Sequence, residues 1–152
     1  MISQASGGPG AVTILLVEDD PGDVVITTEA LQRTKLLHEL HTVSDGEQAL
    51  RFLRRQEEFS DAPRPDLVLL DLNLPRVDGP QVLREVKEDP ELQTIPVVIL
   101  STSDADEDVV RSYRLHANAY VSKPVDFDAF VRIVQQVDDF FLTVVRLPAR
   151  RD

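Results

Sequence analysis

The sequence predicts one α/β domain, in which a parallel sheet is covered by helices on both faces. Three short apolar runs, at 11–17, 67–70 and 95–100, have the length and composition of strands buried on both sides. Stretches with helical apolar spacing lie between the runs, and prolines and glycines interrupt the chain between elements. Five strands alternating with five helices form the pattern of a doubly wound parallel sheet.

Each expected strand is followed by an expected helix. In chain order these pairs are 11–17 and 21–35, 39–44 and 46–57, 67–70 and 79–89, 95–100 and 104–116, and 118–122 and 126 onward.

Local signals in the first half of the chain set the element bounds. Pro21 suits the first position of a helix, and Asp20 before it is a suitable N-cap. The strand at 39–44 is shorter and more polar, as at a sheet edge, and the helix after it has an apolar stripe. Pro63 and Pro65 exclude a continued helix before the third strand.

In the second half, Asp71 ends the third apolar run abruptly, and Pro75 and the Asp-Gly pair at 78–79 require a loop. Pro90 closes the helix that follows, and Asp126 caps the last helix.

The three most apolar strands are the first, third and fourth, so they are expected at the centre of the sheet. The two polar strands then form its edges, which matches the flavodoxin-like strand order 2-1-3-4-5. Right-handed crossovers bring the C-terminal ends of all five strands to one edge, where ligands bind in open α/β sheets.

Composition excludes several kinds of function. The formal net charge of -11 argues against nucleic-acid binding, and the absence of cysteine excludes disulfides and thiolate metal sites. No run approaches the roughly 20 apolar residues of a membrane span, and 3–10 lacks the apolar core of a signal peptide, so a cytoplasmic protein is expected. The expected organisation is a flexible lead-in at 1–10, a domain at 11–139 and a C-terminal arm at 140–152.

Polar residues end the central strands at the ligand-binding edge. They are Glu18 and Asp19 after the first strand, Asp71 and Asn73 after the third, Ser101 after the fourth and Lys123 after the fifth. Adjacent carboxylates repel unless a cation neutralises them, and Mg²⁺ prefers oxygen ligands. A hydroxyl and an ammonium opposite that ion would bind a tetrahedral anion. The residues therefore predict a phosphoryl-transfer site with Asp71 as acceptor, since aspartyl phosphate is a known covalent intermediate.

Taken alone, each residue also has an ordinary structural interpretation. A strand-end aspartate is usually a cap, as expected for Asp20 and Asp78, and a Lys-Pro pair indicates only a turn. The combination is specific, because the acidic pair, Asp71, the hydroxyl and the Lys-Pro pair each end a different strand.

Four motifs carry a resemblance to a known family. They are Val-Glu-Asp-Asp at 17–20, Asp-Leu-Asn-Leu-Pro with a following Asp-Gly at 71–79, Val-Val-Ile-Leu-Ser at 97–101 and Ala-Tyr-Val-Ser-Lys-Pro at 119–124. With these motifs the chain, from about 11 to 140, resembles the receiver domain of bacterial response regulators. The resemblance implies a protein that is not itself an enzyme but accepts a phosphoryl group on Asp71 from a sensor histidine kinase.

The resemblance also implies roles for the other residues at the edge. These are Asp19, Asp71 and the Asn73 carbonyl as direct Mg²⁺ ligands, Glu18 as a ligand through water, Ser101 and Lys123 as phosphoryl-binding groups, and Tyr120 as an aromatic switch that turns inward when Ser101 moves. Two positions depart from the usual pattern. Thr102 stands where most receivers have a small residue, and Ser101 replaces the commoner threonine while keeping its hydroxyl.

The end of the chain is too apolar for a solvated tail. Its apolar residues are Phe140, Phe141, Leu142, Val144, Val145 and Leu147. They could pack on their own domain, but exposed apolar stretches usually mark interfaces, so an arm that docks on a second subunit of a homodimer is expected. About a dozen residues follow the last helix, so no output domain is expected. This ending, with Glu-Asp-Asp-Pro-Gly-Asp at 18–23, resembles the stand-alone receivers that partner phytochrome-type histidine kinases.

Two alternatives differ in function. An aspartate-nucleophile phosphatase of the haloacid dehalogenase type also places an aspartate at a strand end, but it needs a second acid two residues later, where this chain has Asn73. A receiver-like interaction module that is never phosphorylated would share the whole sequence pattern.

Overall fold

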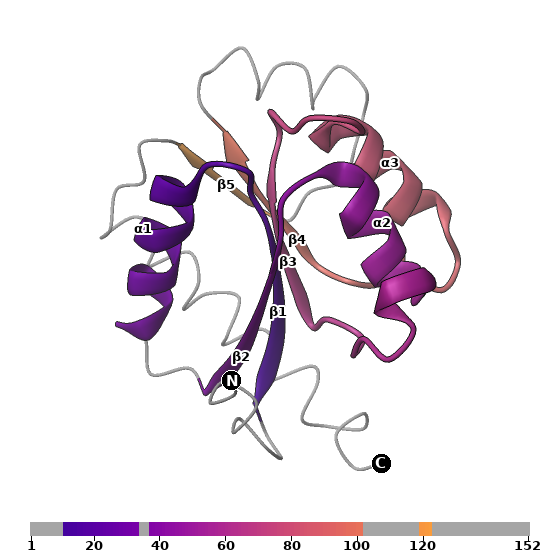
Figure 1. Ribbon diagram of the computed structural model, residues 1–152, viewed down its shortest axis with the longest axis horizontal. Coiled ribbons are helices and arrows are strands. Elements are labelled where there is room, and N and C mark those ends of the chain that lie inside the picture. The colour runs from indigo at the N-terminus through magenta and orange to yellow at the C-terminus, as the bar shows by residue number, and fades with distance from the viewer. Residues whose placement is uncertain (1–10, 34–36, 102–118, 123–152) are drawn as a thin grey trace.

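The computed structural model describes residues 11–33, 37–101 and 119–122 (Figure 1). Its strands are β1 (Val12–Val17), β2 (His38–Val43), β3 (Leu67–Asp71), β4 (Val97–Ser101) and β5 (Ala119–Ser122). Its helices are α1 (Pro21–Gln32), α2 (Gly46–Arg54) and α3 (Gly79–Glu88), with a short 3₁₀ helix, η2, at Glu57–Phe59. The helices expected at 104–116 and from 126 onward lie outside the described residues, as do 1–10 and 140–152.

The five strands form one parallel sheet in the order β2-β1-β3-β4-β5, which confirms the predicted fold and strand order. Helix α1 covers one face of the sheet, and α2 and α3 cover the other (Figure 1). The polar strand β2 lies at an edge, and the apolar strands β1, β3 and β4 lie inside the sheet, as their composition predicts.

The core forms on both faces of the sheet, because successive side chains of a strand point in opposite directions. In β3, Val68 and Leu70 pack on the α2–α3 side, and Leu67 and Leu69 pack on the α1 side. All four are fully buried, and each such side chain contributes roughly 1.5–3 kcal/mol of transfer free energy. The strand that ends at Asp71 is therefore rigidly held.

An aspartate side chain caps the start of each of the three α-helices in the described part of the chain. Asp20 accepts hydrogen bonds from the N–H groups of Gly22 at 2.8 Å and Asp23 at 3.3 Å, and Asp45 and Asp78 cap α2 and α3 in the same way. These contacts satisfy backbone donors that have no partner inside the helix. The predicted capping roles of Asp20 and Asp78 are confirmed.

Several element bounds differ from the predicted ones. Helix α2 ends at Arg54 rather than near Glu57, because Arg55 adopts a left-handed conformation with φ of 55° and its N–H bonds to the carbonyls of Arg51 and Phe52. Strand β4 begins two residues later than expected, since the N–H of Ile95 bonds back to the carbonyl of Leu92 at 3.0 Å in a turn. Within the described ranges, no helix has the length and apolar character needed to cross a membrane.

Candidate functional site

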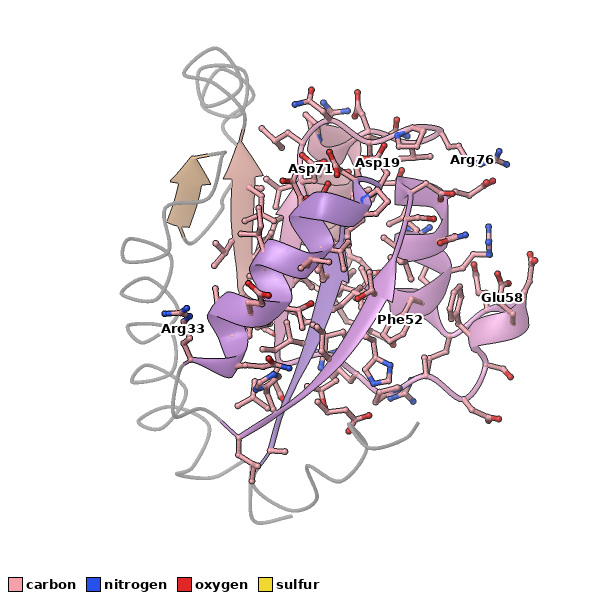
Figure 2. All side chains as sticks on the ribbon, turned by 60° about the vertical axis from the view of Figure 1, so that its left-hand side comes forward. Asp19, Arg33, Phe52, Glu58, Asp71 and Arg76 are labelled. Atoms are coloured by element: carbon pink, nitrogen blue, oxygen red, sulfur yellow. The ribbon has the colours of Figure 1, made fainter. Side chains whose placement is uncertain are left out.

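Three carboxylates meet at the C-terminal edge of the sheet. Glu18, Asp19 and Asp71 each offer one oxygen, and these three oxygens lie within 4.8 Å of one another. Glu18 and Asp71 are only 1% and 2% exposed, whereas Asp19 is open to solvent. Figure 2 shows Asp19 and Asp71 close together at one end of the sheet, with Arg33 toward the other end. The cluster thus consists of two buried carboxylates beside an exposed one.

Strand register brings these residues together. β1 and β3 are neighbouring strands, and Val17 of β1 pairs with Leu70 of β3. The next residues in the chain, Glu18 and Asp71, therefore lie side by side at the same edge of the sheet. Backbone hydrogen bonds between strands continue beyond this pair. The N–H of Glu18 donates to the carbonyl of Val43 at 3.0 Å, and the N–H of Leu72 donates to the carbonyl of Leu100 at 3.3 Å. The sheet itself therefore fixes the backbone that carries the acidic residues.

Local hydrogen bonds orient two of the carboxylates. Oε2 of Glu18 accepts from the N–H of Asp20 at 3.2 Å, and Oδ1 of Asp71 accepts from the N–H of Asn73 at 3.1 Å. Each carboxylate is thus held by an amide two residues further along the chain.

The donor set fits a hard divalent cation. All three groups are carboxylates, oxygen ligands are those that Mg²⁺ and Mn²⁺ take, and three like charges this close gain most from a cation between them. The structure therefore brings together Glu18, Asp19 and Asp71, the three carboxylates of the metal site that the sequence predicts.

The structure also places the backbone of other predicted site residues. Ser101 is the last residue of β4, next to β3, and so lies at the same edge as Asp71. Asn73 is the second residue of the loop after β3, and Tyr120 lies in β5 opposite Ile99 of β4. Lys123, Thr102 and the predicted interface residues at 140–147 lie outside the described part of the chain.

The loop between β3 and α3 has a larger part in the site than the sequence analysis expected. An ideal Cβ on Gly79 would lie 2.5 Å from both the carbonyl oxygen of Asp71 and the Cα of Leu72, so the start of α3 touches the end of β3 directly. The N–H of Gly79 bonds to the carbonyl of Leu72 at 3.1 Å and closes the loop. The sequence signal for this contact is the glycine after a capping aspartate, a pair that by itself predicts only a loop.

Comparison with known proteins agrees with this geometry. Residues 14–135 match the model of the response regulator receiver domain. The chain is 46% identical over 136 residues to the response regulator Rcp1 of Synechocystis sp., covering 90% of this chain and 92% of the relative. It is also 38% identical to the probable methanogenesis regulatory protein FilR2 of Methanothrix harundinacea, covering 89% and 86%.

Solved structures give the same result. The phosphorylated cyanobacterial phytochrome response regulator RcpA superposes with a TM-score of 0.76 at 45% identity, over 91% of this chain and 99% of that one. The Mn²⁺-bound form of Rcp1 gives 0.75 at 45% identity over the same shares. The fold, the acidic cluster and these matches lead to one conclusion: the chain belongs to the family of response regulator receiver domains.

Proposed function

We propose that this protein is a two-component response regulator that accepts a phosphoryl group on Asp71 from a sensor histidine kinase. The observation that supports the proposal most is the buried Asp71 carboxylate within 4.8 Å of the Glu18 and Asp19 oxygens. Such an arrangement suits phosphoryl transfer, in which catalysis is mostly positioning and charge neutralisation.

In the proposed step, a carboxylate oxygen of Asp71 attacks the phosphorus and forms a new O–P bond. The bond from phosphorus to the donor's histidine nitrogen breaks, and its electron pair remains on that nitrogen. The receiver's own pocket would promote this transfer, and it would also promote the later hydrolysis in which water displaces the carboxylate.

We assign the cation to Mg²⁺, held directly by Asp19, Asp71 and the carbonyl of Asn73, with Glu18 acting through water. When bound, Mg²⁺ would offset the negative charge of the carboxylates and of the phosphoryl oxygens. The hydroxyl of Ser101 and the ammonium of Lys123 would bind those oxygens from the other side.

The output is proposed to be a change of surface rather than a reaction. Phosphorylation adds about -1.5 to -2 charges at pH 7, which would draw Ser101 toward Asp71 and leave space for Tyr120 to turn inward. The phosphoryl group would thereby shift the balance between two arrangements of the surface around β4 and β5.

The kinase partner is proposed to be of the phytochrome type. The solved RcpA is described as a phytochrome response regulator, and this chain is 45% identical to it over nearly its whole length. We propose further that the protein acts in the cytoplasm, in contact with neither nucleic acid nor membrane.

The segment at 140–152 is proposed to be a dimer arm that extends from a domain at 11–139. Cutting the chain after Asp139 should then convert a dimer to a monomer in analytical ultracentrifugation. A dimer of unchanged stability after truncation would contradict the arm.

The central experiment is labelling by acetyl phosphate in Mg²⁺, followed by intact mass. Wild type should gain one phosphoryl group, and Asp71→Asn should gain none, because the amide cannot form the acyl phosphate. Asp78→Asn is the matched control, since Asp78 lies in the same loop but caps α3, and asparagine is an equally good cap. Labelling that persists in Asp71→Asn would show another acceptor.

The same assay separates the alternatives. A receiver-like module that is never phosphorylated would leave the wild type unlabelled at saturating Mg²⁺. The haloacid dehalogenase alternative is not favoured, because the receiver family covers 14–135 and Asn73 lacks the acid that such an enzyme needs.

A further inference from the structure

The loop from Leu72 to Asp78, between β3 and α3, contacts the carboxylate of Asp71. Its amide at Asn73 donates to Oδ1 of Asp71 at 3.1 Å, and the carbonyl of Asn73 belongs to the proposed metal site. A shift of this loop by a few tenths of an ångström would therefore move both a hydrogen-bond donor and a metal ligand. What holds the loop in place thus matters for the site.

One support is a backbone contact with the N-terminus of α2. An ideal Cβ on Gly46 would lie 1.8 Å from the carbonyl oxygen of Val77 and 2.6 Å from its carbonyl carbon. Neither atom belongs to a flexible side chain that could move away. Only glycine lets the loop and the helix approach this closely.

A second support joins the same two segments through side chains. Arg76 has a φ of 69°, a left-handed conformation that residues other than glycine rarely adopt, and its Nε lies 2.8 Å from Oε1 of Glu47. Oδ2 of Asp45, the α2 cap, lies 4.0 Å from the same nitrogen. Figure 2 shows Arg76 at the same end of the molecule as Asp19 and Asp71.

We propose that Gly46 and Glu47, at the start of α2, are positioning residues for the acceptor site. They fix the β3–α3 loop through Val77 and Arg76, and the loop in turn fixes Asp71 through the Asn73 amide. The proposal rests on the proposed function for its effect on metal binding, but the fixation of the loop is a property of the metal-free protein.

In Gly46→Ala, the direction of the change in stability tests the contact with Val77. Alanine favours a helix more than glycine does, so without the Val77 contact the variant would be neutral or more stable. The contact predicts instead a displaced loop, an altered NMR signal of the Asn73 amide in the metal-free protein, and Mg²⁺ binding weakened about tenfold. Gly22→Ala is the matched control in the first turn of α1, since its Cβ would meet only Oδ1 of Asp20 at 3.3 Å.

The Arg76–Glu47 pair provides a second test on surface residues, where folding is not at risk. Arg76→Gly tolerates the left-handed conformation without strain and removes the whole arginine side chain, and Glu47→Ala removes its carboxylate partner. Each should weaken Mg²⁺ binding about two- to fivefold and shift the Asn73 amide signal, and the double variant should be no weaker than either single one.

The outcomes separate the two proposals. An Asn73 amide signal and an Mg²⁺ affinity that are unchanged in Gly46→Ala would overturn the positioning role, as would additive effects in the double variant. Wild-type protein that binds no Mg²⁺ would overturn the proposed function instead, and the amide signal without metal would still decide whether α2 fixes the loop.

Discussion

The two ends of the sheet differ in how their charged side chains are arranged. At the C-terminal end, three carboxylates lie within 4.8 Å of one another. At the N-terminal end, a cleft of about 380 Å³ between the ends of α2 and α3 is lined by both arginines and acids. There Arg54 reaches Glu85 at 2.9 Å, and Arg64 donates to the carbonyl of Glu91 at 2.6 Å. The acidic residues at the C-terminal end are thus gathered together, whereas those at the N-terminal end are interleaved with arginines.

The largest effect is expected for Asp19→Asn, a single substitution in the carboxylate cluster at the C-terminal end of the sheet. It removes a proposed metal ligand, so Mg²⁺ affinity should fall at least about 100-fold, or about 2.7 kcal/mol. Without metal the same change relieves like-charge repulsion at an exposed position, so stability should rise by about 0.5 kcal/mol. Calorimetric Mg²⁺ titration and urea denaturation measure the two effects. If stability falls in the absence of metal, the carboxylates are not repelling one another.

A smaller effect is expected from Arg64→Ala at the other end. The substitution removes hydrogen bonds to the carbonyl of Glu91 and to Oγ1 of Thr94 at 3.0 Å, so stability should fall by about 1 kcal/mol. Arg55→Ala is the control in the same cleft and should change stability by less than about 0.5 kcal/mol, because the left-handed backbone remains. Neither variant should alter Mg²⁺ affinity. A changed Mg²⁺ affinity in either variant would mean that the two ends of the sheet are coupled.

The smallest effect is a pH dependence at Glu85. The hydrogen bond from Arg54 lowers the pKa of the Glu85 carboxyl, so its stabilising contribution is present at neutral pH and is lost as pH falls through this depressed pKa. Glu85→Gln should therefore cost only about 0.3 kcal/mol at pH 7, since the pair is partly exposed, and nothing near pH 3. Urea denaturation at both pH values checks this, with Glu88→Gln on the same helix as control. An equal loss at both pH values would point to packing rather than charge.

Much of the fold could be predicted from local chemistry. The unbroken apolar run before Asp71 identified a central strand, and the polar residues of β2 identified an edge, because burial on two faces requires apolar side chains in every position. Asp20 and Asp78 were predicted as caps from their place before a helix. The end of α2 was missed, since nothing in the sequence at Arg55 marks a left-handed residue that glycine would normally occupy.

The candidate site divides in the same way. Glu18, Asp19 and Asp71 could be named from the sequence because each follows an apolar strand, and parallel strands end at a common edge. That their oxygens approach within 4.8 Å required the register of β1 against β3. The roles of Ser101, Lys123 and Tyr120 remain predictions.

The sequence by itself determined which residues are buried, which strand lies at the centre and which carboxylate ends it, since these depend on the order of apolar and polar residues. Only the tertiary structure decided how the loop after Asp71 packs against the start of α2. Arg76 and Glu47 lie 29 positions apart in the chain, and no local propensity indicates that a loop backbone will rest on Gly46. Such contacts follow from how closely two backbones approach once the core has packed, and that distance is set by the whole sheet.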